Sequence, residues 1–478
     1  MNRQFHRVVF NAARSMRMVV QETATSTGKG SNKATKATGG APASAAVLAS
    51  VLKGAALATM LTTCAHAQIV GAPNVPGNLR PTVLVAPNGV PLINVQTPSA
   101  AGVSRNVYNA FNVGTNGAIL NNSRTAVQTQ LGGFVQGNPN LATGPARIIL
   151  NEVNGGSPSQ LRGYIEVGGQ RAEVVIANPA GISVDGGGFI NASRATLTTG
   201  TPQFNAIGGL DSFLVRGGTV TIDGAGLDAS KTDYAAILAR AVQANASIWA
   251  SGVKVVTGAN QISADHSQIT PTAGTGTAPT FALDVAALGG MYANKIVLVG
   301  SEAGLGVRNA GNIGAGAGGL VVTAAGRLEN IGTLEGQRVE LTTPGDISNR
   351  GGTIRQGSSA GLTIASPVLS NTNGGVIGAE PVSASASSGG TATPPTSTPS
   401  SGGGTATPST TDAGGTSTST GGSSTPATYT PPAPGVIAAG GTISNDGGKI
   451  YAGGPITLNT PQINKADGWL NMVRMGLA

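Results

Sequence analysis

Aromatic residues, charged residues and cysteine are all scarce in this chain of 478 residues. Aromatic side chains make up 3% of the sequence and charged ones 10%, against an ordinary charged share of about 25%. A single large globular interior is therefore not expected, and any core must consist of Val, Ile, Leu and Ala in thin layers. Glycine, with 74 residues, has about twice its usual share. This composition predicts short strands, frequent turns and a solenoid.

The positive charge of the chain is concentrated at its N-terminus. Residues 1–67 contain eight Lys and Arg and one acid, Glu22, whereas the remaining residues contain twenty bases and nineteen acids. The net charge of +8 thus falls to +1 once the first 67 residues are set aside. Because no basic excess remains in the rest of the chain, no nucleic-acid partner is expected.

Long hydrophobic runs are also absent, and the one short run looks like part of a signal peptide. Residues 54–67, GAALATMLTTCAHA, end in Ala65-His66-Ala67, which has the A-x-A form of a signal-peptidase site. We therefore predict cleavage before Gln68. The run is far below the ~20 residues that span a bilayer, so a permanent transmembrane helix is not expected.

The single cysteine, Cys64, precedes the predicted cleavage site. The tetrapeptide LTTC also resembles a lipoprotein box, although such a box usually has a small residue at the position of Thr63. Lipidation of Cys64 therefore remains an alternative. If cleavage occurs before Gln68, the exported chain contains no cysteine, and no disulfide can lock it in an oxidising compartment.

Short β-type runs separated by Asn and Gly begin near residue 106. They include ARIILNEV, GYIEVGG, AEVVIANP, ATLTTG, GTVTIDG, KVVTGAN and KIVLVG. In a parallel β-helix, coils of about 20 residues bury Val, Ile and Leu, and Gly or Asn take the positive-φ corners. The glycine-rich stretch 177–200, with its lone acid Asp185, fits a corner followed by a strand. It lacks the helix and lysine of a phosphate-binding loop.

A repeat becomes visible after residue 300. Asn309, Asn330, Asn349 and Asn371 follow each other at intervals of 21, 19 and 22 residues, and Asn445 resumes the pattern. With a rung spacing of ~4.8 Å, roughly twelve to fifteen rungs would make a rod of about 60 to 75 Å. One helix is predicted at 233–242, DYAAILARAV, where the apolar residues share one helical face. The final segment, DGWLNMVRMGLA, matches no rung.

Several motifs together resemble known secreted proteins. The first thirty residues, with their Met-Asn-Arg start, helical spacing of apolar residues and Val-Val-x-Glu-Thr-Ala centre, resemble the extended signal peptide of large autotransporters and two-partner secretion exoproteins. The stretches NVYNAFNVGTNGAILNNS (106–123), Asn138-Pro139-Asn140-Leu141, and Asn178-Pro179-Ala180-Gly181-Ile182 followed by GFINASRATLTTGTP resemble the secretion domain of filamentous-haemagglutinin-like exoproteins. The repeats after residue 300 resemble haemagglutinin repeats.

This resemblance implies an all-β fold, a right-handed parallel β-helix. It also implies passage through the Sec machinery and signal peptidase, and then through an outer-membrane barrel carrying POTRA modules in a Gram-negative bacterium. The product would be secreted or held at the cell surface, where a glycan or protein receptor on a host or bacterial cell would be its partner. Adhesion is the expected role, and a relative of contact-dependent inhibition exoproteins without its toxin domain is the alternative.

The resemblance assigns transporter recognition to the two Asn-Pro motifs. The residues concerned are Asn138, Pro139, Asn140, Leu141, Asn178, Pro179, Gly181 and Ile182. Physically, both motifs are turns, because proline presets φ and asparagine tolerates a bent backbone. A purely structural role therefore remains open. The second motif has Ala180 where relatives often have Asn, and Val184 and Gly187 replace a Cys pair that occurs in some relatives.

These features divide the chain into six segments. They are an extended signal peptide (1–67), a secretion domain (68–295), haemagglutinin-type repeats (296–380), a disordered Pro/Ser/Thr/Gly linker (381–434), further rungs (435–466) and a tail (467–478). The linker is expected to be disordered because it cannot bury enough apolar surface to offset its ordering entropy.

An enzyme is the weaker hypothesis. A β-helical polysaccharide lyase needs clustered carboxylates, but Asp211, Asp223, Asp228 and Asp233 are spaced by 12, 5 and 5 residues and are expected at solvated turns. His266, the only histidine after residue 67, is expected at the surface. No G-x-S-x-G motif or His-Cys cluster is present. No catalytic residue, metal or cofactor is therefore predicted.

Overall fold

The computed structural model describes residues 6–11, 16–21, 69–357, 361–378, 435–451, 456–464 and 469–471. They form two units that divide between Ala65 and His66. In the first unit, β1 (His6–Asn11) pairs antiparallel with β2 (Met16–Gln21). The apolar residues of this segment have helical spacing, but its described residues form strands. The strands contain the pairs Val8-Val9 and Val19-Val20, and β-branched residues favour extended backbone.

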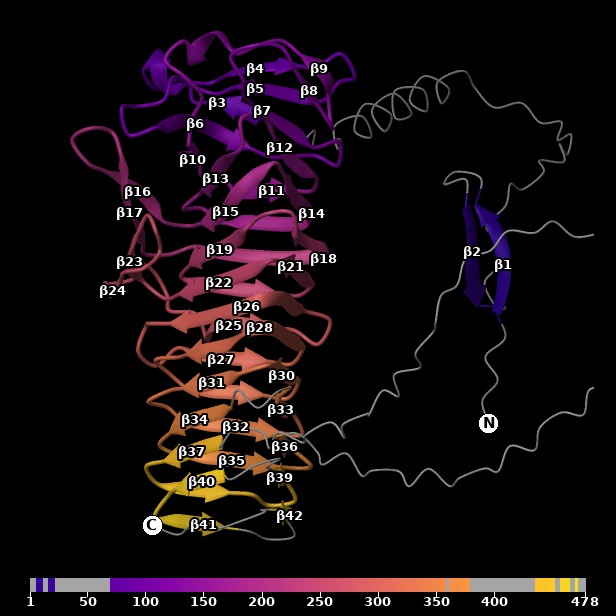
Figure 1. The fold of residues 1–478 in the computed structure, drawn as a ribbon, viewed down its shortest axis with the longest axis vertical. Helices are drawn as coiled ribbons and strands as arrows, with labels where there is room; N and C mark the ends of the chain where they lie inside the picture. Colours follow the sequence, from indigo (N-terminus) through magenta and orange to yellow (C-terminus); the bar gives the residue numbers. More distant parts are fainter. Residues whose placement is uncertain are drawn as a thin grey trace, which may run out of the picture. The chain divides into compact units, whose positions relative to one another are not determined.

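The second unit is a parallel β-helix, as predicted (Figure 1). Each coil contributes one strand to each of three parallel faces. Face 1 contains β6 (Val103–Phe111), β10 (Ile148–Val153), β13 (Ala172–Ala177), β15 (Ala192–Thr198), β19 (Tyr234–Ala239), β22 (Gly252–Thr257), the second halves of β26 (Gly290–Gly300) and β28 (Asn312–Thr323), β31 (Val339–Thr342), β34 (Leu362–Ser366), β37 (Gly435–Ala439) and β40 (Ile456–Asn459).

The other two faces follow the same order along the axis. Face 2 contains β11 (Ser159–Leu161), the first halves of β14 (Ile182–Ile190) and β18 (Thr219–Ala229), β20 (Ala241–Ala244), β25 (Phe281–Val285), β27 (Gly306–Asn309), β29 (Leu328–Asn330), β32 (Ile347–Arg350), β35 (Leu369–Thr372), β38 (Thr442–Ser444) and β41 (Gln462–Asn464). Face 3 contains β5 (Pro91–Asn94), β7 (Ala118–Asn122), β12 (Tyr164–Gly169), the remaining halves of β14, β18, β26 and β28, and β21 (Ser247–Ala250), β30 (Thr333–Gly336), β33 (Thr353–Gln356), β36 (Val376–Ile377), β39 (Lys449–Tyr451) and β42 (Trp469–Asn471).

The core runs along the inside of the coil as stacks of aliphatic side chains. Val322, Leu341, Ile364 and Ile437 occupy the same register in four successive rungs of face 1, and each is at most 1% exposed. Alternation along each strand produces this arrangement: in β34, Leu362 and Ile364 point inward while Thr363 is exposed. Burying each such side chain contributes roughly 1.5–3 kcal/mol. The twelve strands of face 1 make eleven steps of about 4.8 Å, or about 53 Å.

Antiparallel elements cover the N-terminal end and one side of the coil. At the end, β3 (Ile69–Gly71) pairs with β6, β4 (Thr82–Val85) pairs with β5, the 3-10 turn η1 (Gly77–Leu79) lies between them, and β8 (Val127–Thr129) pairs with β9 (Gly133–Val135). On the side, a four-stranded antiparallel sheet, which we call the side sheet, lies over face 1 (Figure 1). It consists of β16 (Thr201–Phe204), β17 (Leu210–Val215), β23 (Asn260–Ser263) and β24 (Ile269–Pro271). Both elements shield apolar outer faces of the coil.

The repeated asparagines form a hydrogen-bonded ladder inside the coil. Asn309 Nδ2 donates to Asn330 Oδ1 at 2.8 Å, and Asn330 donates to Asn349 at 2.7 Å. The chain of bonds continues from Asn349 to Asn371 at 2.8 Å and from Asn371 to Asn445 at 2.6 Å. All five side chains are at most 1% exposed. The interval of about twenty residues is thus explained by stacking. The positive-φ positions are taken by other residues, among them Asn191, Asn373 and many glycines.

The rung after the predicted linker stacks directly on the rung before it. β37, β38 and β39 pair in parallel with β34, β35 and β36, respectively. The prediction that the repeat resumes near Asn445 is therefore confirmed, whereas the predicted linker at 381–434 lies outside the described residues. In the segment expected to match no rung, β42 (Trp469–Asn471) pairs with β39. That expectation is wrong, because Leu470 continues the register of Ile450.

The helix predicted at 233–242 is two strands, β19 and β20. Ala235, Ile237 and Ala239 point into the coil, while Ala236 and Leu238 pack beneath the side sheet. A strand buried on both faces has no apolar–polar alternation, so its sequence cannot be told from a buried helix. In the described part of the chain no helix is long and apolar enough to cross a bilayer.

Candidate functional site

The first Asn-Pro motif is a buried cap on a short exposed turn. Pro139–Leu141 forms the 3-10 turn η2, and the Asn138 side chain accepts a hydrogen bond from the Asn140 backbone N–H at 3.0 Å. Asn138 Nδ2 donates to the carbonyls of Val95, at 2.8 Å, and Asn121, at 2.9 Å. Asn138 is 2% exposed and Leu141 is fully buried. The asparagine thus ties the turn to two neighbouring segments of the coil.

The second motif repeats this arrangement between β13 and β14. Asn178 Oδ1 accepts from the Ala180 N–H at 2.9 Å, and Asn178 Nδ2 donates to Ser157 O and Ser159 Oγ, both at 3.0 Å. Gly181 has φ of +119°, and a Cβ there would lie 3.0 Å from the Thr219 carbonyl oxygen. Glycine is therefore required at this position. Ile182 is 1% exposed and begins β14.

The parts of both motifs that reach solvent are the prolines. Pro139 and Pro179 are exposed, and Asn140 and Ala180 are partly exposed. Beside the first turn lies an open pocket of about 430 Å³, lined by Pro98, Ser99, Ala100, Gly102, Thr143, Gly144, Pro145 and Arg147. The Thr97 hydroxyl donates to the Asn140 carbonyl at 2.7 Å and joins this rim to the turn. A protein partner could contact the two prolines and this rim, but not the buried side-chain amides of Asn138 and Asn178.

Replacing Asn138 by alanine is expected to lower the free energy of unfolding by about 2–3 kcal/mol, because it removes the turn's cap and two buried donors. Replacing the exposed Pro139 by alanine should change it by less than about 1 kcal/mol. Urea unfolding, with hydrogen exchange measured over residues 92–144, checks both values. Equal destabilisation by the two substitutions would show that the turn is not held through the asparagine.

The two positions that replace a cysteine pair lie against each other. Val184 is fully buried, and a Cβ built on Gly187 would come within 2.8 Å of Val184 Cγ1. The glycine therefore leaves room for the valine side chain, and apolar packing occupies the place where two cysteines could meet. Ala180 keeps the turn's backbone hydrogen bond to Asn178 although it lacks an amide side chain.

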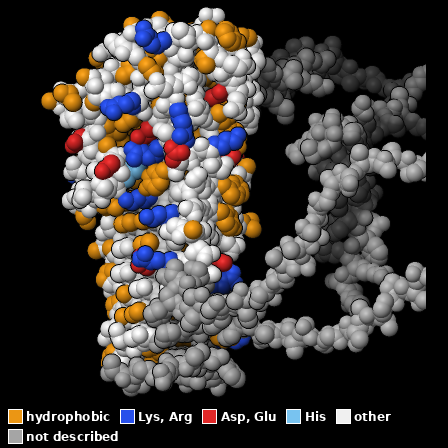
Figure 2. Space-filling view, in the orientation of Figure 1, with side chains coloured by type: hydrophobic (Ala, Val, Ile, Leu, Met, Phe, Trp, Pro, Cys, Tyr) orange, Lys and Arg blue, Asp and Glu red, His pale blue; other side chains and the backbone are white. Residues whose placement is uncertain are grey.

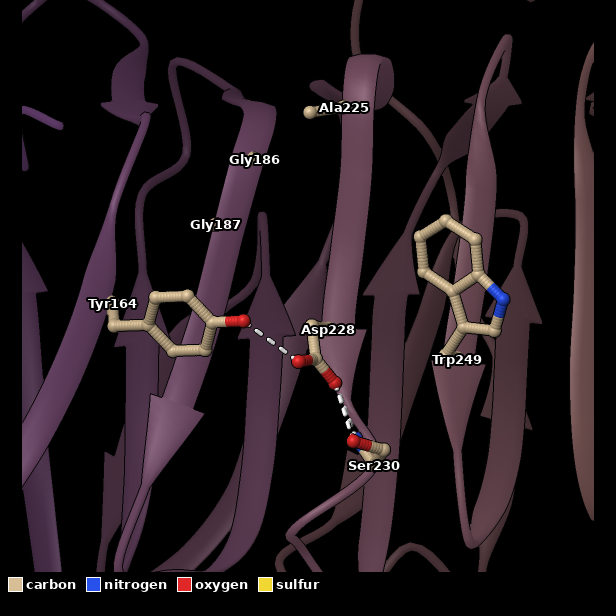
Figure 3. A pocket seen from close by; sticks show the side chains of 7 residues that line it. All are labelled: Tyr164, Gly186, Gly187, Ala225, Asp228, Ser230 and Trp249. Carbon is tan, nitrogen blue, oxygen red and sulfur yellow. Dashed lines mark hydrogen bonds between the residues drawn. The ribbon is translucent and has the colours of Figure 1, made fainter.

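A second pocket, of about 550 Å³, lies on face 3 (Figure 3). It is lined by Tyr164, Gly186, Gly187, Ala225, Asp228, Ser230 and Trp249. The Tyr164 hydroxyl donates to Asp228 Oδ2 at 2.7 Å, and Asp228 Oδ1 accepts from the Ser230 hydroxyl at 2.6 Å and the Ser230 N–H at 3.0 Å. Asp228 was expected at a solvated turn, but it lies within β18. Its hydrogen bonds hold both carboxylate oxygens in place.

The hydrogen bonds in this pocket outweigh the effect of burial on the pKa of Asp228. Burial alone would raise the pKa of Asp228, but donation from Ser230 and Tyr164 and the charge of Lys231 together hold that pKa below its ordinary value. The pKa of Tyr164 is raised, first by its hydrogen bond to Asp228. At neutral pH the pair is therefore a carboxylate and a neutral phenol. Sequence reasoning missed this site because its members come from separate rungs.

The other acids predicted at solvated turns do not gather with Asp228. Asp233 forms an exposed bidentate pair with Arg171, and Asp223 accepts from Asn245 Nδ2 at 2.8 Å. Asp211 is exposed and is the second residue of β17. Among the described residues, no group of three His, Cys, Asp or Glu side chains could hold a metal ion.

His266 is buried, so the expectation that it lies at the surface is wrong. The residue is 1% exposed beneath the side sheet, with φ of +63° and its ring 6.1 Å from that of Phe213. Burial, followed by the charges of Arg194 and Lys254, lowers the pKa of His266 to about 3, against a smaller opposing effect of Asp265. The turn that carries it was not recognisable because left-handed backbone at a histidine has no sequence pattern.

Acid is expected to loosen the side sheet through His266. Because the folded pKa is below the unfolded value of 6.5, stability is present above pH 6.5 and is lost as the pH falls toward 3. At pH 5 the loss is about 2 kcal/mol. Hydrogen exchange of residues 260–271 at pH 7.5 and 5.0, corrected for intrinsic rates, checks this. In His266→Asn, which also tolerates positive φ, the pH effect should disappear; an unchanged effect would rule out His266 as its source.

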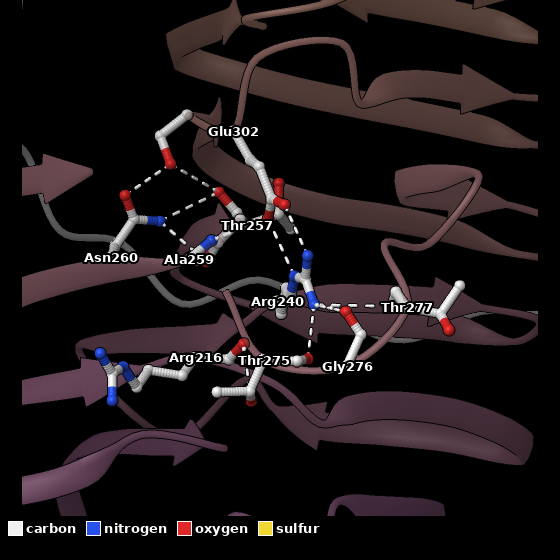
Figure 4. A network of polar contacts seen from close by, with 11 residues as sticks. Arg216, Arg240, Thr257, Ala259, Asn260, Thr275, Gly276, Thr277 and Glu302 are labelled. Carbon is white, nitrogen blue, oxygen red and sulfur yellow. Dashed lines mark hydrogen bonds and ion pairs between the residues drawn. The ribbon is translucent and has the colours of Figure 1, made fainter. Parts of the chain in front are cut away.

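A buried ion pair joins the loop after β24 to the coil (Figure 4). The guanidinium of Arg240 donates to both carboxylate oxygens of Glu302, at 2.7 and 3.0 Å, and to the Thr275 carbonyl at 2.7 Å. Glu302 also accepts from the Ala259 N–H at 3.1 Å. The hydrogen bond from Arg240 lowers the pKa of Glu302 despite burial. Every contact in this network is internal, so its role is structural.

Charged side chains on the surface are interspersed. On the face shown in Figure 2, basic and acidic side chains lie close together. Ion pairs such as Arg194–Glu173, Arg105–Glu152 and Arg308–Asp284 join side chains of opposite charge. Such pairing leaves little net field for attracting a polyanion.

Comparisons with known proteins identify the family of this fold. The model of the TPS secretion domain matches residues 67–330, which is more than half of the chain. The chain belongs to this family. The model of the extended signal peptide of the type V secretion system matches residues 1–60. The resemblances to both are thereby confirmed, and this exoprotein is exported by two-partner secretion through the periplasm to the cell surface or the medium.

A solved structure and several curated proteins are similar to this exoprotein. The crystal structure of a filamentous hemagglutinin secretion domain matches with a TM-score of 0.52 and 34% identity, covering 65% of this chain and 98% of that one. Toxin CdiA of Yersinia pestis is 48% identical over 73% of this chain and 11% of its own length. The tRNA nuclease CdiA-2 of Burkholderia pseudomallei is 49% identical over 69% of this chain and 10% of its own length.

The exoprotein thus spans about a tenth of the length of these curated relatives. The matched part is a secretion domain with a haemagglutinin-like β-helix. The nuclease and toxin names belong to those much longer proteins.

Proposed function

We propose that an outer-membrane barrel transporter with POTRA modules recognises the N-terminal rungs of this β-helix through the surface that the two Asn-Pro turns shape. The observation that carries the proposal is that Asn138 and Asn178 are buried and bonded within the fold, while Pro139 and Pro179 protrude. The asparagines would set the shape of the recognised surface, and the prolines with the adjoining rim would form the contact.

Before that step, the Sec machinery would carry the chain across the inner membrane, and signal peptidase would cut between Ala67 and Gln68. Ala65 and Ala67 fit the small-residue requirement of the enzyme. These residues lie outside the described ranges. The division into a secretion domain at 68–295 and repeats from 296 is also a proposal, and the boundary falls within the continuous strand β26 (Gly290–Gly300).

Outside the cell, the rod would present its rungs to a receptor on another cell, as an adhesin does. Its parallel faces offer a long, regular surface, and solenoids commonly use such surfaces for binding. The similarity to proteins named as toxins favours a second candidate, in which the β-helix serves contact-dependent inhibition by holding a toxic segment away from the cell. In neither case would the described β-helix itself catalyse a reaction.

Site-specific photocrosslinking tests the transporter contact. A photoreactive phenylalanine analogue is placed at Pro139 or at Pro179 of the full chain, which is then mixed with the purified periplasmic region of a cognate transporter. Both positions should yield a crosslinked product. The matched control carries the analogue at Arg355, which is also exposed but lies in β33, far along the coil. Equal crosslinking at Arg355, or none at either proline, would refute the proposed contact.

A further inference from the structure

Four polar and aromatic side chains follow one line along face 3, which we call the aromatic strip: Tyr164, Asp228, Trp249 and Tyr292. The register places Tyr164 opposite Gly188, Gly188 opposite Asp228, Asp228 opposite Trp249, and Trp249 opposite Tyr292. The strip therefore crosses four rung steps, or about 19 Å. Residues far apart in the sequence thus form one continuous outward-facing surface.

Glycines beneath the rings give the strip its form. A Cβ on Gly188 would lie 2.4 Å from a ring carbon of Tyr164, and a Cβ on Gly226 would lie 3.2 Å from the Trp249 ring. A Cβ on Gly290 would lie 3.0 Å from a ring carbon of Tyr292. Each ring therefore lies over bare backbone and does not extend freely into solvent. This support holds the rings in place before any ligand arrives, which reduces the entropy cost of binding.

The strip exposes aromatic surface in a chain that has little of it. Trp249 is 43% exposed and Tyr292 is 39% exposed, although aromatic residues are only 3% of the sequence. Neither ring is needed for the core, which consists of aliphatic side chains on the inner side of the same strands. Exposed aromatic side chains gathered on rigid strands indicate a binding surface.

The carboxylate at the centre of the strip supplies directed hydrogen bonding. Asp228 lies between the rings of Tyr164 and Trp249, and its oxygens are oriented by Tyr164 and Ser230 (Figure 3). An ionised carboxylate accepts strong hydrogen bonds from hydroxyl groups. The pocket around it has a volume of about 550 Å³ and combines apolar ring faces with few polar groups, as ligand sites generally do.

We propose that the aromatic strip binds a neutral glycan, with sugar rings stacked on Trp249 and Tyr292 and a pair of sugar hydroxyls donating to Asp228. A sugar ring offers an apolar C–H face and a hydroxyl rim, which match the aromatic faces and the carboxylate. Sialylated or sulfated glycans fit less well, because Asp228 repels their charge and no Lys or Arg lines the pocket. Lys231, whose charge acts on Asp228, is not part of the lining. The site does not depend on the route of export.

Other occupants fit this surface less well. A peptide strand cannot add to it, because the strands of the strip are already paired on both sides by neighbouring rungs. A metal ion has one carboxylate available here, which is too few oxygen ligands.

A glycan array tests this proposal with the full chain. The array contains neutral, sialylated and sulfated oligosaccharides, and the affinity for the best neutral hit is then measured by isothermal titration calorimetry, which needs no tryptophan in the variants. Binding to neutral glycans is expected. Trp249→Ala and Asp228→Asn should each weaken it by about tenfold or more, whereas Trp249→Phe should retain most of it.

The control is Phe134→Ala, which removes an aromatic ring that is 60% exposed on β9 and does not line the pocket. This variant should bind as the unaltered chain does. Since Trp249 lies at the surface, its replacement should leave the urea midpoint unchanged, and that measurement separates loss of binding from unfolding. No neutral hit, preference for sulfated or sialylated glycans, or binding that persists in Trp249→Ala would each overturn the proposal.

Discussion

Replacing Asn349 by alanine is expected to lower the free energy of unfolding by about 3 kcal/mol, one of the two largest effects that this structure predicts. Asn349 is fully buried at the centre of the asparagine ladder. Its side chain accepts from Asn330 Nδ2 and donates to Asn371 Oδ1 and to the Gly352 carbonyl at 2.9 Å. The substitution leaves the Asn371 oxygen without this donor and opens a cavity, and both effects cost free energy.

Urea unfolding of the full chain measures this effect, with hydrogen exchange reporting which rungs open first. Loss of protection should be centred on β32 and β35 and spread to both neighbouring rungs, because solenoid stability is carried by contacts between nearest neighbours. The matched control is Asn312→Ala, at an exposed asparagine of β28 that is not part of the ladder. A similar loss in both variants would show that the ladder contributes nothing beyond asparagine's local effect.

Replacing Arg240 by leucine is expected to cost about 3 kcal/mol or more, because it leaves the Glu302 carboxylate largely buried without its cation. The same change frees the Thr275 carbonyl, so the loop between β24 and β25 should lose protection from hydrogen exchange along with β23. Thermal unfolding and exchange of residues 258–280 measure the two consequences.

The control for Arg240 is Arg355→Leu, which breaks a pair with Glu335 whose side chains are 48% and 39% exposed. Exposed pairs of this kind contribute about 0–1 kcal/mol. If Arg240→Leu were no more destabilising than Arg355→Leu, the buried pair would not be what holds the loop to the coil.

The fold was predictable from the sequence because the β-helix repeats one local pattern. Runs such as ARIILNEV and AEVVIANP alternate or concentrate aliphatic residues over a strand's length, and they form β10 and β13 as expected. Spacing alone could not show which way a repeated residue points. The repeated asparagines were therefore correct as markers of the rungs, but their inward stacking could not be predicted because it depends on hydrogen bonds between coils.

The candidate sites were also predictable only where they depend on local sequence. The Asn-Pro turns are local, so the bend at Asn138 and Asn178 follows from the sequence, although the burial of both asparagines does not. Tyr164 and Asp228 are 64 residues apart, and only the register of β12, β14 and β18 brings them together. The available signal was an aromatic residue within two positions of a glycine in GYIEVGG and GGMYANK.

The central claim is that this chain, whose exported part is a β-helix, leaves the cell through a dedicated transporter that recognises its N-terminal rungs. Its most direct test is mass spectrometry of the growth medium for a peptide that begins at Gln68, with and without co-expression of a cognate barrel transporter. The account predicts this peptide only when the transporter is present, less of it with Asn138→Ala or Asn178→Ala, and the usual amount with Asn312→Ala. Release without a transporter, or retention of a form lipidated at Cys64, would contradict it.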